Sequence, residues 1–171
     1  RTNFELLHYY YHMDTQLQFE WSTIFNKTIE ICHEDANYEA YSAREKMLAF
    51  VFTFLQNLNE TESTIIQQNR FTYLKPIKQE VNSYFDSLIF EATNSGEIQA
   101  RPFIANYYTS VLYTAFLSVL VFWSNDRSED RQNTDVMVEK TVHFAFDMLA
   151  PNAIDSGIDL VQNLFKLSNK K

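Results

Sequence analysis

The chain is very poor in the residues that make tight turns, with only 2 glycines and 3 prolines among 171 residues. Strands joined by short hairpins usually depend on Gly, Asn or Pro at those turns. The 46% hydrophobic and 16% aromatic content excludes a disordered tail and is enough for one domain with a sizeable core. We therefore predict an all-α fold, a bundle of seven to eight helices joined by short polar loops.

Charge and cysteine content exclude several classes of protein. The net charge is −8 and the pI is about 4.9. DNA affinity that is independent of base sequence comes from Lys and Arg neutralising phosphates, so this chain by itself is expected to bind nucleic acid poorly. Cys32 is the single cysteine, which excludes an internal disulfide and favours a reduced, cytoplasmic compartment. The first residues lack a continuous apolar segment, so we expect no signal peptide.

Local signals mark where helices begin and end. Asp14 or Thr15 can cap the start of a helix that runs to about residue 33, and Ser42 with Glu45 forms the S-x-x-E capping box of another. Gly96 stands where a left-handed residue ends a helix. The predicted helices cover residues 14–33, 42–59, 61–70, 76–94, 102–123, 134–149 and 153–167.

Two of these helices have more apolar surface than one chain can bury. Residues 102–125 contain no charged side chain and are long enough to cross a bilayer, but the strongly apolar part is only the 13 residues 111–123. We predict a buried central helix rather than a membrane span. With helix 134–149 it is expected to form a four-helix homodimer interface about a two-fold axis. The predicted interface residues are Phe116, Leu120, Val138, Val142, Ala145 and Leu149.

Metal and enzyme chemistry have little support in the sequence. Two E-x-x-H pairs, Glu5 with His8 and Glu30 with His33, have the ligand pattern of di-metal helical bundles. On a continuous helix, 25 residues separate the pairs by about 37 Å, which is too far for one metal centre. His8 and His12, at positions i and i+4, could also share one metal with Glu5. No nucleophile or phosphate-binding motif is present. We predict no metal site, no cofactor and no enzymatic activity.

The aromatic excess allows two interpretations that can both hold. The rings can fill a bulky core, or they can line an apolar cavity between helices in which Tyr hydroxyls orient a small apolar ligand. The predicted ligand-binding residues are Trp21, Phe25, Phe52, Phe85, Tyr108 and Tyr113.

Three segments of the chain resemble the C-terminal ligand-binding domain of TetR-type transcriptional regulators. They are SAREKMLAFVFTFLQNL, IFEATNSGEIQARPF and VFWSNDRSED. The Gly96-Glu97 turn precedes the long penultimate helix, and a W-x-x-D sequence, Trp123 to Asp126, ends it. The resemblance covers residues 14–168. The earlier segment LLHYYYHMDTQL is similar to a degenerate end of the helix-turn-helix that precedes such domains.

The resemblance implies two parts and a function. Residues 1–13 would be a remnant of a DNA-binding domain or an N-terminal helix, and residues 14–171 a ligand-binding and dimerisation domain with the cavity between helices 15–33, 42–58, 77–94 and 102–123. The chain would be part of a bacterial homodimeric regulator that binds a small apolar ligand and couples it to DNA release, contacting operator DNA only through an N-terminal domain not evident here.

Two other functions remain open at this point. The first is a lipid or isoprenoid carrier of the same fold without DNA binding, for which an amphipathic segment at residues 158–167, IDLVQNLFKL, would be used at a membrane. The second is the di-metal bundle enzyme considered above.

Overall fold

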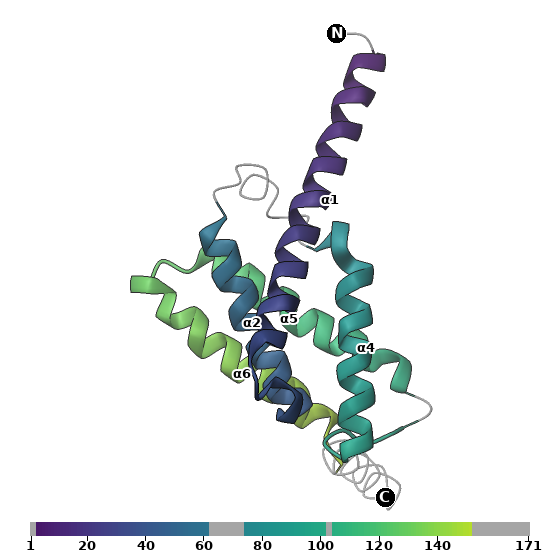
Figure 1. The fold of residues 1–171 in the computed structure, drawn as a ribbon, viewed down its shortest axis with the longest axis vertical. Coiled ribbons are helices and arrows are strands. Elements are labelled where there is room, and N and C mark those ends of the chain that lie inside the picture. Colours follow the sequence, from purple (N-terminus) through teal and green to yellow (C-terminus); the bar gives the residue numbers. More distant parts are fainter. Residues whose placement is uncertain (1–2, 62–73, 102–103, 152–171) are drawn as a thin grey trace, which may run out of the picture.

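The computed structural model describes residues 3–61, 74–101 and 104–151, without the side chains of residues 3–11 and 14 (Figure 1). This part of the chain is all-α, as predicted, and contains no strand. It has five α-helices rather than seven to eight; the predicted helices 61–70 and 153–167 lie outside the described residues. The five are α1 (Asn3–Glu34), α2 (Ala43–Glu60), α4 (Lys78–Ser95), α5 (Tyr108–Asn125) and α6 (Gln132–Leu149).

The first helix is longer than its sequence signals suggest. α1 runs without a break for 32 residues, so the prediction that it starts at Asp14 or Thr15 was wrong. No Pro or Gly interrupts residues 3–34, and polar side chains such as Gln16, which donates to Glu20 one turn later (3.2 Å), are accommodated on an exposed helix surface. The N-terminal part of α1 stands clear of the other helices (Figure 1), and Leu17 is the first buried residue among the described side chains of this helix.

Two predicted helix ends are confirmed. The Ser42 hydroxyl accepts a hydrogen bond from the amide of Glu45 (3.2 Å), and the Glu45 carboxylate accepts from the amide of Ser42 (2.8 Å) at the start of α2. Gly96 follows α4 in the left-handed conformation (φ 81°), which a residue without a side chain adopts at little cost. The amide of Ile98 then bonds the carbonyl of Ala92 (3.0 Å) and returns the chain toward the core.

The last two helices form an antiparallel pair. α5 begins at Tyr108, after a 3₁₀ turn at Ala105–Tyr107, rather than at Pro102 as predicted. α6 matches its prediction within two residues. Its start is fixed by Asp126, whose carboxylate accepts hydrogen bonds from the amide (2.8 Å) and the hydroxyl (2.7 Å) of Thr134. The amide of Ser128, which donates to the same carboxylate (2.9 Å), and then these Thr134 bonds lower the pKa of Asp126 to about 2.

The core is a cluster of aromatic rings centred on Phe50 of α2. Its ring centroid lies 5.4 Å from that of Phe116, 5.7 Å from that of Phe54 and 6.0 Å from that of Phe85, mostly in edge-to-face geometry. α5 packs between α4 and α6, while α2 contacts α1, α4 and α6. α1 packs on α2 and on the 3₁₀ turn before α4 (Lys75–Ile77), so α1 and α4 diverge beyond that turn (Figure 1).

One helical segment, Ala105–Asn125, is long and apolar enough to cross a membrane by length and composition. A third of its apolar window is buried inside the protein. The buried side of α5 includes Leu112, Phe116 and Leu120, each with no exposed surface. The helix therefore contributes to the core of this domain, and length and composition alone are weak evidence for a membrane span.

Candidate functional site: a cleft between α1 and α4

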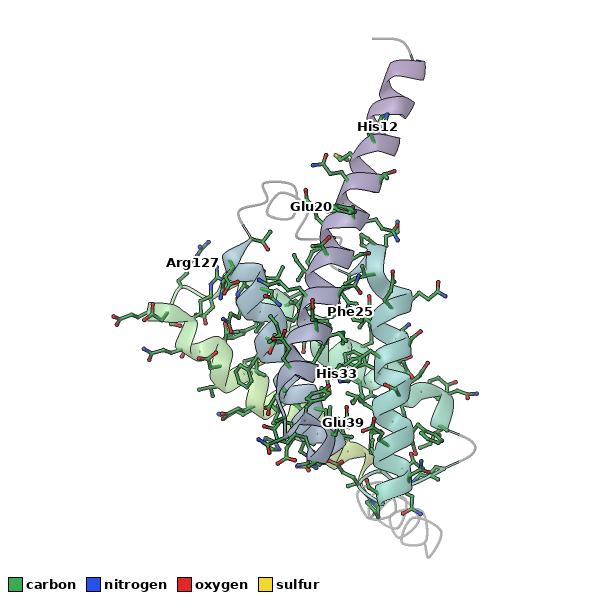
Figure 2. The ribbon with its side chains drawn as sticks, in the orientation of Figure 1. His12, Glu20, Phe25, His33, Glu39 and Arg127 are labelled. Carbon is green, nitrogen blue, oxygen red and sulfur yellow. The ribbon has the colours of Figure 1, made fainter. Side chains whose placement is uncertain are left out.

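A cleft of about 670 Å³ lies between α1 and α4. Its lining residues are Phe25 and Ile29 from α1, and Gln79, Glu80, Ser83 and Tyr84 from α4. Figure 2 shows Phe25 on the side of α1 that faces α4. The cleft is open to solvent and has one aromatic side chain on each wall, so it can hold a small apolar molecule.

The inner wall of the cleft ends in a pair of tyrosine hydroxyl groups. The hydroxyl oxygens of Tyr84 and Tyr38 lie 2.9 Å apart, and the Tyr84 hydroxyl also donates to the carbonyl of Lys46 (3.4 Å). Burial raises the pKa of Tyr84 well above that of an ordinary phenol. Tyr84 is therefore a neutral group at this site, and its ring is tilted against that of Phe50 with 4.6 Å between the centroids.

The positive charge of a lysine behind this tyrosine pair is already balanced by a carboxylate. Lys46 is 6% exposed, and its ammonium lies 2.7 Å from the carboxylate of Glu91. The same ammonium is 5.5 Å from the centre of the Tyr38 ring, a cation–π contact. A buried charge with a carboxylate and an aromatic face beside it is satisfied, so Lys46 is a structural element of the wall.

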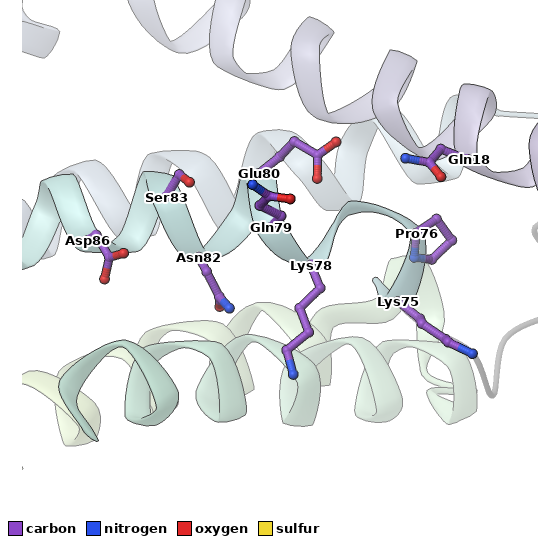
Figure 3. Close-up of a pocket in the computed structure, with 9 residues that line it drawn as sticks. All are labelled: Gln18, Lys75, Pro76, Lys78, Gln79, Glu80, Asn82, Ser83 and Asp86. Carbon is purple, nitrogen blue, oxygen red and sulfur yellow. The ribbon is translucent and has the colours of Figure 1, made fainter. Parts of the chain in front are cut away.

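A second, more polar hollow of about 540 Å³ adjoins the cleft along α4 (Figure 3). It shares Gln79, Glu80 and Ser83 with the cleft, and Gln18 of α1 faces these side chains across the gap. The side-chain carbonyl oxygen of Asn82, on the other side of α4, is buried and has no hydrogen-bond partner within the described residues. The start of α4 therefore presents polar groups on two sides.

The six predicted ligand-binding residues occupy three different places. Trp21, Phe25 and Phe85 belong to the aromatic core, where Trp21 stacks on Phe54 with 6.1 Å between centroids. Phe25 alone among the six lines the cleft. The cavity expected between four helices is thus largely filled by rings, and the hollow lies nearer the surface.

The other three predicted ligand residues lie apart from the cleft. Phe52 is half-buried at the edge of the core. Tyr108 is buried and donates its hydroxyl to the carbonyl of Gln99 (2.9 Å), which anchors the start of α5. Tyr113 is half-buried, burial raises its pKa, and its ring centre lies 5.4 Å from the ammonium of Lys78.

All six predicted interface residues are buried inside the single chain, each at most 3% exposed. They are Phe116, Leu120, Val138, Val142, Ala145 and Leu149. The outer face of the same two helices carries an apolar groove of about 440 Å³, which Ala145 alone of the six lines, together with other side chains that include Tyr107, Val111, Phe144 and Met148. Tyr107 is 66% exposed and Phe144 is 65% exposed.

Sequence reasoning missed the polar members of the cleft. Glu80 and Ser83 looked like ordinary surface residues of a helix because their neighbours Val81 and Phe85 form its buried face. Their positions on the helix could have indicated a role, because residues beside the buried face of a helix border any cleft that remains at the edge of that face. That hollow itself depends on the angle between α1 and α4, which no local pattern specifies.

A network around Arg44 fixes α6 beside α2. The Arg44 guanidinium lies 2.8 Å from the Asp147 carboxylate, 3.1 Å from Nδ1 of His143 and 3.6 Å from the Glu97 carboxylate. It also lies 5.6 Å from the centre of the Phe146 ring. One half-buried cation therefore joins the start of α2, the turn after α4 and the last turns of α6.

The described residues contain no group of three or more His, Cys, Asp or Glu side chains that could hold a metal ion. The side chains of Glu5 and His8 lie outside the described set. α1 is continuous between the two E-x-x-H pairs, so the separation of about 37 Å holds. His33 instead lies 3.3 Å from the carboxylate of Glu39 at an exposed position.

Comparison with known protein families identifies the family of this chain. Residues 46–164 match the model of the tetracyclin repressor-like C-terminal domain. The chain belongs to this TetR-like family. No curated protein and no solved structure matches it significantly. Domains of this TetR-like family generally dimerise and bind small ligands, are typically non-enzymatic, and belong to soluble regulators.

Proposed function

We propose that the chain is the effector-binding and dimerisation module of a bacterial, cytoplasmic TetR-like transcriptional regulator, in which ligand binding is coupled to DNA release. The observation that carries this proposal is the family match over residues 46–164, which spans most of α2 and all of α4, α5 and α6. The coupling is a free energy: a ligand that binds one dimer arrangement better than another shifts the population toward it.

The cleft between α1 and α4 is the ligand site in this proposal. Its walls, Phe25, Ile29 and Tyr84, supply apolar contact area, and Gln79 and Ser83 supply orienting polar groups. Its volume of about 670 Å³ lies in the range of small-molecule pockets. A ligand bound there touches both α1 and α4, so it can change the angle between these two helices.

The groove on α5 and α6 is the dimer interface in this proposal. Its lining is mainly apolar and contains no charged side chain: Tyr107, Ser110, Val111, Thr114, Ala115, Ser118, Thr141, Phe144, Ala145 and Met148. Small residues let another helix approach closely, and exposed rings at positions 107 and 144 supply contact area. A second copy meeting this face would form a four-helix interface about a two-fold axis.

Native mass spectrometry of the purified chain tests both parts. We expect a dimer, with a co-purified organic adduct of a few hundred daltons if the effector is abundant in the producing cells. A monomer at micromolar concentration would contradict the dimerisation module. A dimer that binds no member of a broad panel of small molecules would contradict the effector site.

The carrier alternative gains no specific support from the described residues. Its distinguishing feature, the amphipathic segment at residues 158–167, lies outside them. The mass of a co-purified adduct would separate the two functions, because a carrier is expected to hold a lipid or isoprenoid.

A further inference from the structure

The charge of the cleft comes from a single carboxylate. Of the six residues that line it, only Glu80 and Tyr84 can ionise, and the buried Tyr84 hydroxyl is neutral. Glu80 is half-buried, and no hydrogen bond or ion pair joins it to any residue in the described part of the chain. A partly desolvated carboxylate without a partner favours the approach of a positive charge.

Three lysines near the cleft have contacts elsewhere, and a fourth, Lys75, lines the adjoining hollow but not the cleft. Lys78 is two residues away, but its ammonium lies over the ring of Tyr113 of α5. Figure 3 shows Glu80 on the side of α4 that faces α1, and Lys78 on the opposite side. On α1, Lys27 pairs with Glu60 at 3.0 Å. Lys46, behind the wall, pairs with Glu91.

The walls beside Glu80 suit a cation with an apolar body. Phe25 and Tyr84 present aromatic rings from opposite sides of the cleft, and the face of such a ring attracts a cation, most strongly when water is excluded. Ile29 adds apolar area without a charge. Together these residues offer two aromatic side chains, a hydrocarbon surface and one negative group within a single hollow.

We propose that the effector of this site is an organic cation with an aromatic or otherwise apolar body, and that Glu80 is its counter-ion. This inference rests on the proposed effector-binding function and specifies the chemical class of the ligand. An anionic ligand of the same size would meet the Glu80 carboxylate without a compensating cation in the lining of the cleft.

Glu80 also has a structural role that the test must separate. It lies in the first turn of α4, where a carboxylate interacts favourably with the positive end of the helix. Glu80→Gln removes the charge and keeps the size of the side chain. Circular dichroism and thermal unfolding of this variant show whether α4 is still formed.

The binding experiment compares three probes of similar shape and different charge. Tetraphenylphosphonium is a cation, tetraphenylborate is an anion, and triphenylphosphine oxide is neutral. Titration of the full chain by calorimetry should give the tightest binding for the cation. We expect Glu80→Gln to weaken cation binding roughly tenfold and to leave the neutral probe unchanged. The matched control, Glu139→Gln, removes the same charge from an exposed position on α6 that does not line the cleft.

Charge reversal sharpens the result. Glu80→Lys should reverse the preference, so that tetraphenylborate binds more tightly than tetraphenylphosphonium. Equal affinities for the three probes in the unmodified chain, or an equal loss for Glu80→Gln and Glu139→Gln, would overturn the inference. In that outcome, binding of the neutral probe together with a dimer would leave the effector-binding module intact, whereas the absence of binding by all three would count against both.

Discussion

The cleft and the groove are two hollows on one small core, and they differ in chemistry. The cleft lies between helices that diverge, α1 and α4, and its lining includes one carboxylate, that of Glu80, which has no partner within the described residues. The groove lies between helices that pack along their length, α5 and α6, and its lining contains no charge. The cleft is the larger and more open of the two hollows, about 670 Å³ against about 440 Å³ for the groove. A partly polar hollow suits a small molecule, while an apolar face on two packed helices suits another helix pair.

This contrast shows how one core can serve two kinds of recognition. Both hollows rest on the same aromatic cluster, in which Phe116 of α5 contacts Phe54 and Phe85 with centroid distances of 5.1 Å and 5.9 Å. The core is therefore the part of the molecule through which the two hollows are in contact. The following predictions test whether the two regions are separable and which residues join them.

The largest effect is expected from Phe116→Ala. This side chain has no exposed surface, so its removal leaves a cavity and should cost about 3–5 kcal/mol of unfolding free energy. Urea unfolding measures the loss, and both ligand binding and dimerisation should fall together. Phe19→Ala is the control, because Phe19 is 71% exposed and should change stability by less than about 0.5 kcal/mol. Equal losses for the two variants would contradict the central position of Phe116.

The next effect should be confined to the groove. Phe144→Asp places a charge on the proposed interface and should weaken the dimer roughly 10- to 100-fold, measured by analytical ultracentrifugation over a dilution series. Phe90→Asp is the matched control, since Phe90 is equally exposed but lies on α4. An unchanged dimer constant for Phe144→Asp would remove this face from the interface.

Val142→Asp distinguishes the groove from the core beneath it. Val142 is 1% exposed, so a carboxylate there is buried without a partner and should destabilise the fold of each protomer by several kcal/mol. We expect loss of cooperative unfolding together with loss of the dimer. A well-folded monomer would instead show that the buried stripe itself meets the second copy.

A smaller effect is expected at the junction of α2 and α6. Arg44→Met keeps apolar contact with Phe146 but loses the contacts with Glu97 and Asp147, and should reduce stability by about 1 kcal/mol. The control is Lys27→Met, whose ion pair with Glu60 is about half exposed and should contribute little. Thermal unfolding measures the stability loss of both variants, and 1 M NaCl should reduce the difference in stability between Arg44→Met and the unmodified chain. A larger loss at Lys27 would contradict the network.

The smallest effect concerns acid stability at the start of α6. The folded pKa of Asp126 is about 2, below its value of about 3.9 in an unfolded chain. Its stabilising contribution is therefore fully present above about pH 4 and is lost as the pH falls through 2. Asp126→Asn should remove this contribution, so it should lower stability at pH 7 and flatten the slope of stability against pH between 4 and 2. An unchanged slope would mean that this carboxylate titrates alike in both states.

Local features of the fold were predictable because their causes are local. The capping box of Ser42 and Glu45 and the left-handed Gly96 each depend on a few neighbouring residues, and both were found as expected. The start of α1 was not predictable in this way. Asp14 and Thr15 can cap a helix, but a cap is used only where the chain before it leaves the helix, and here it does not.

The site was only partly predictable, because an apolar stripe on a helix does not indicate whether the same chain, a second copy or a ligand covers it. Val138 and Val142 have the spacing of an interface, and α2 and α5 of the same chain cover that face of α6. Likewise, Phe25 was expected beside a ligand and lines the cleft, whereas Phe85 was expected there and fills the core. The distinction depends on helix packing angles, which are set by contacts far apart in sequence.

The unbroken length of α1 has a mechanical consequence. A helix of 32 residues is about 48 Å long, so a tilt of one degree about its C-terminal end moves its free end by about 0.8 Å. The cleft borders α1 near Phe25, partway along the helix. A small tilt of α1 at the cleft, one that leaves the aromatic core undisturbed, would therefore produce a larger displacement at the N-terminal end of the helix. In this way α1 would act as a lever arm that amplifies the effect of ligand binding.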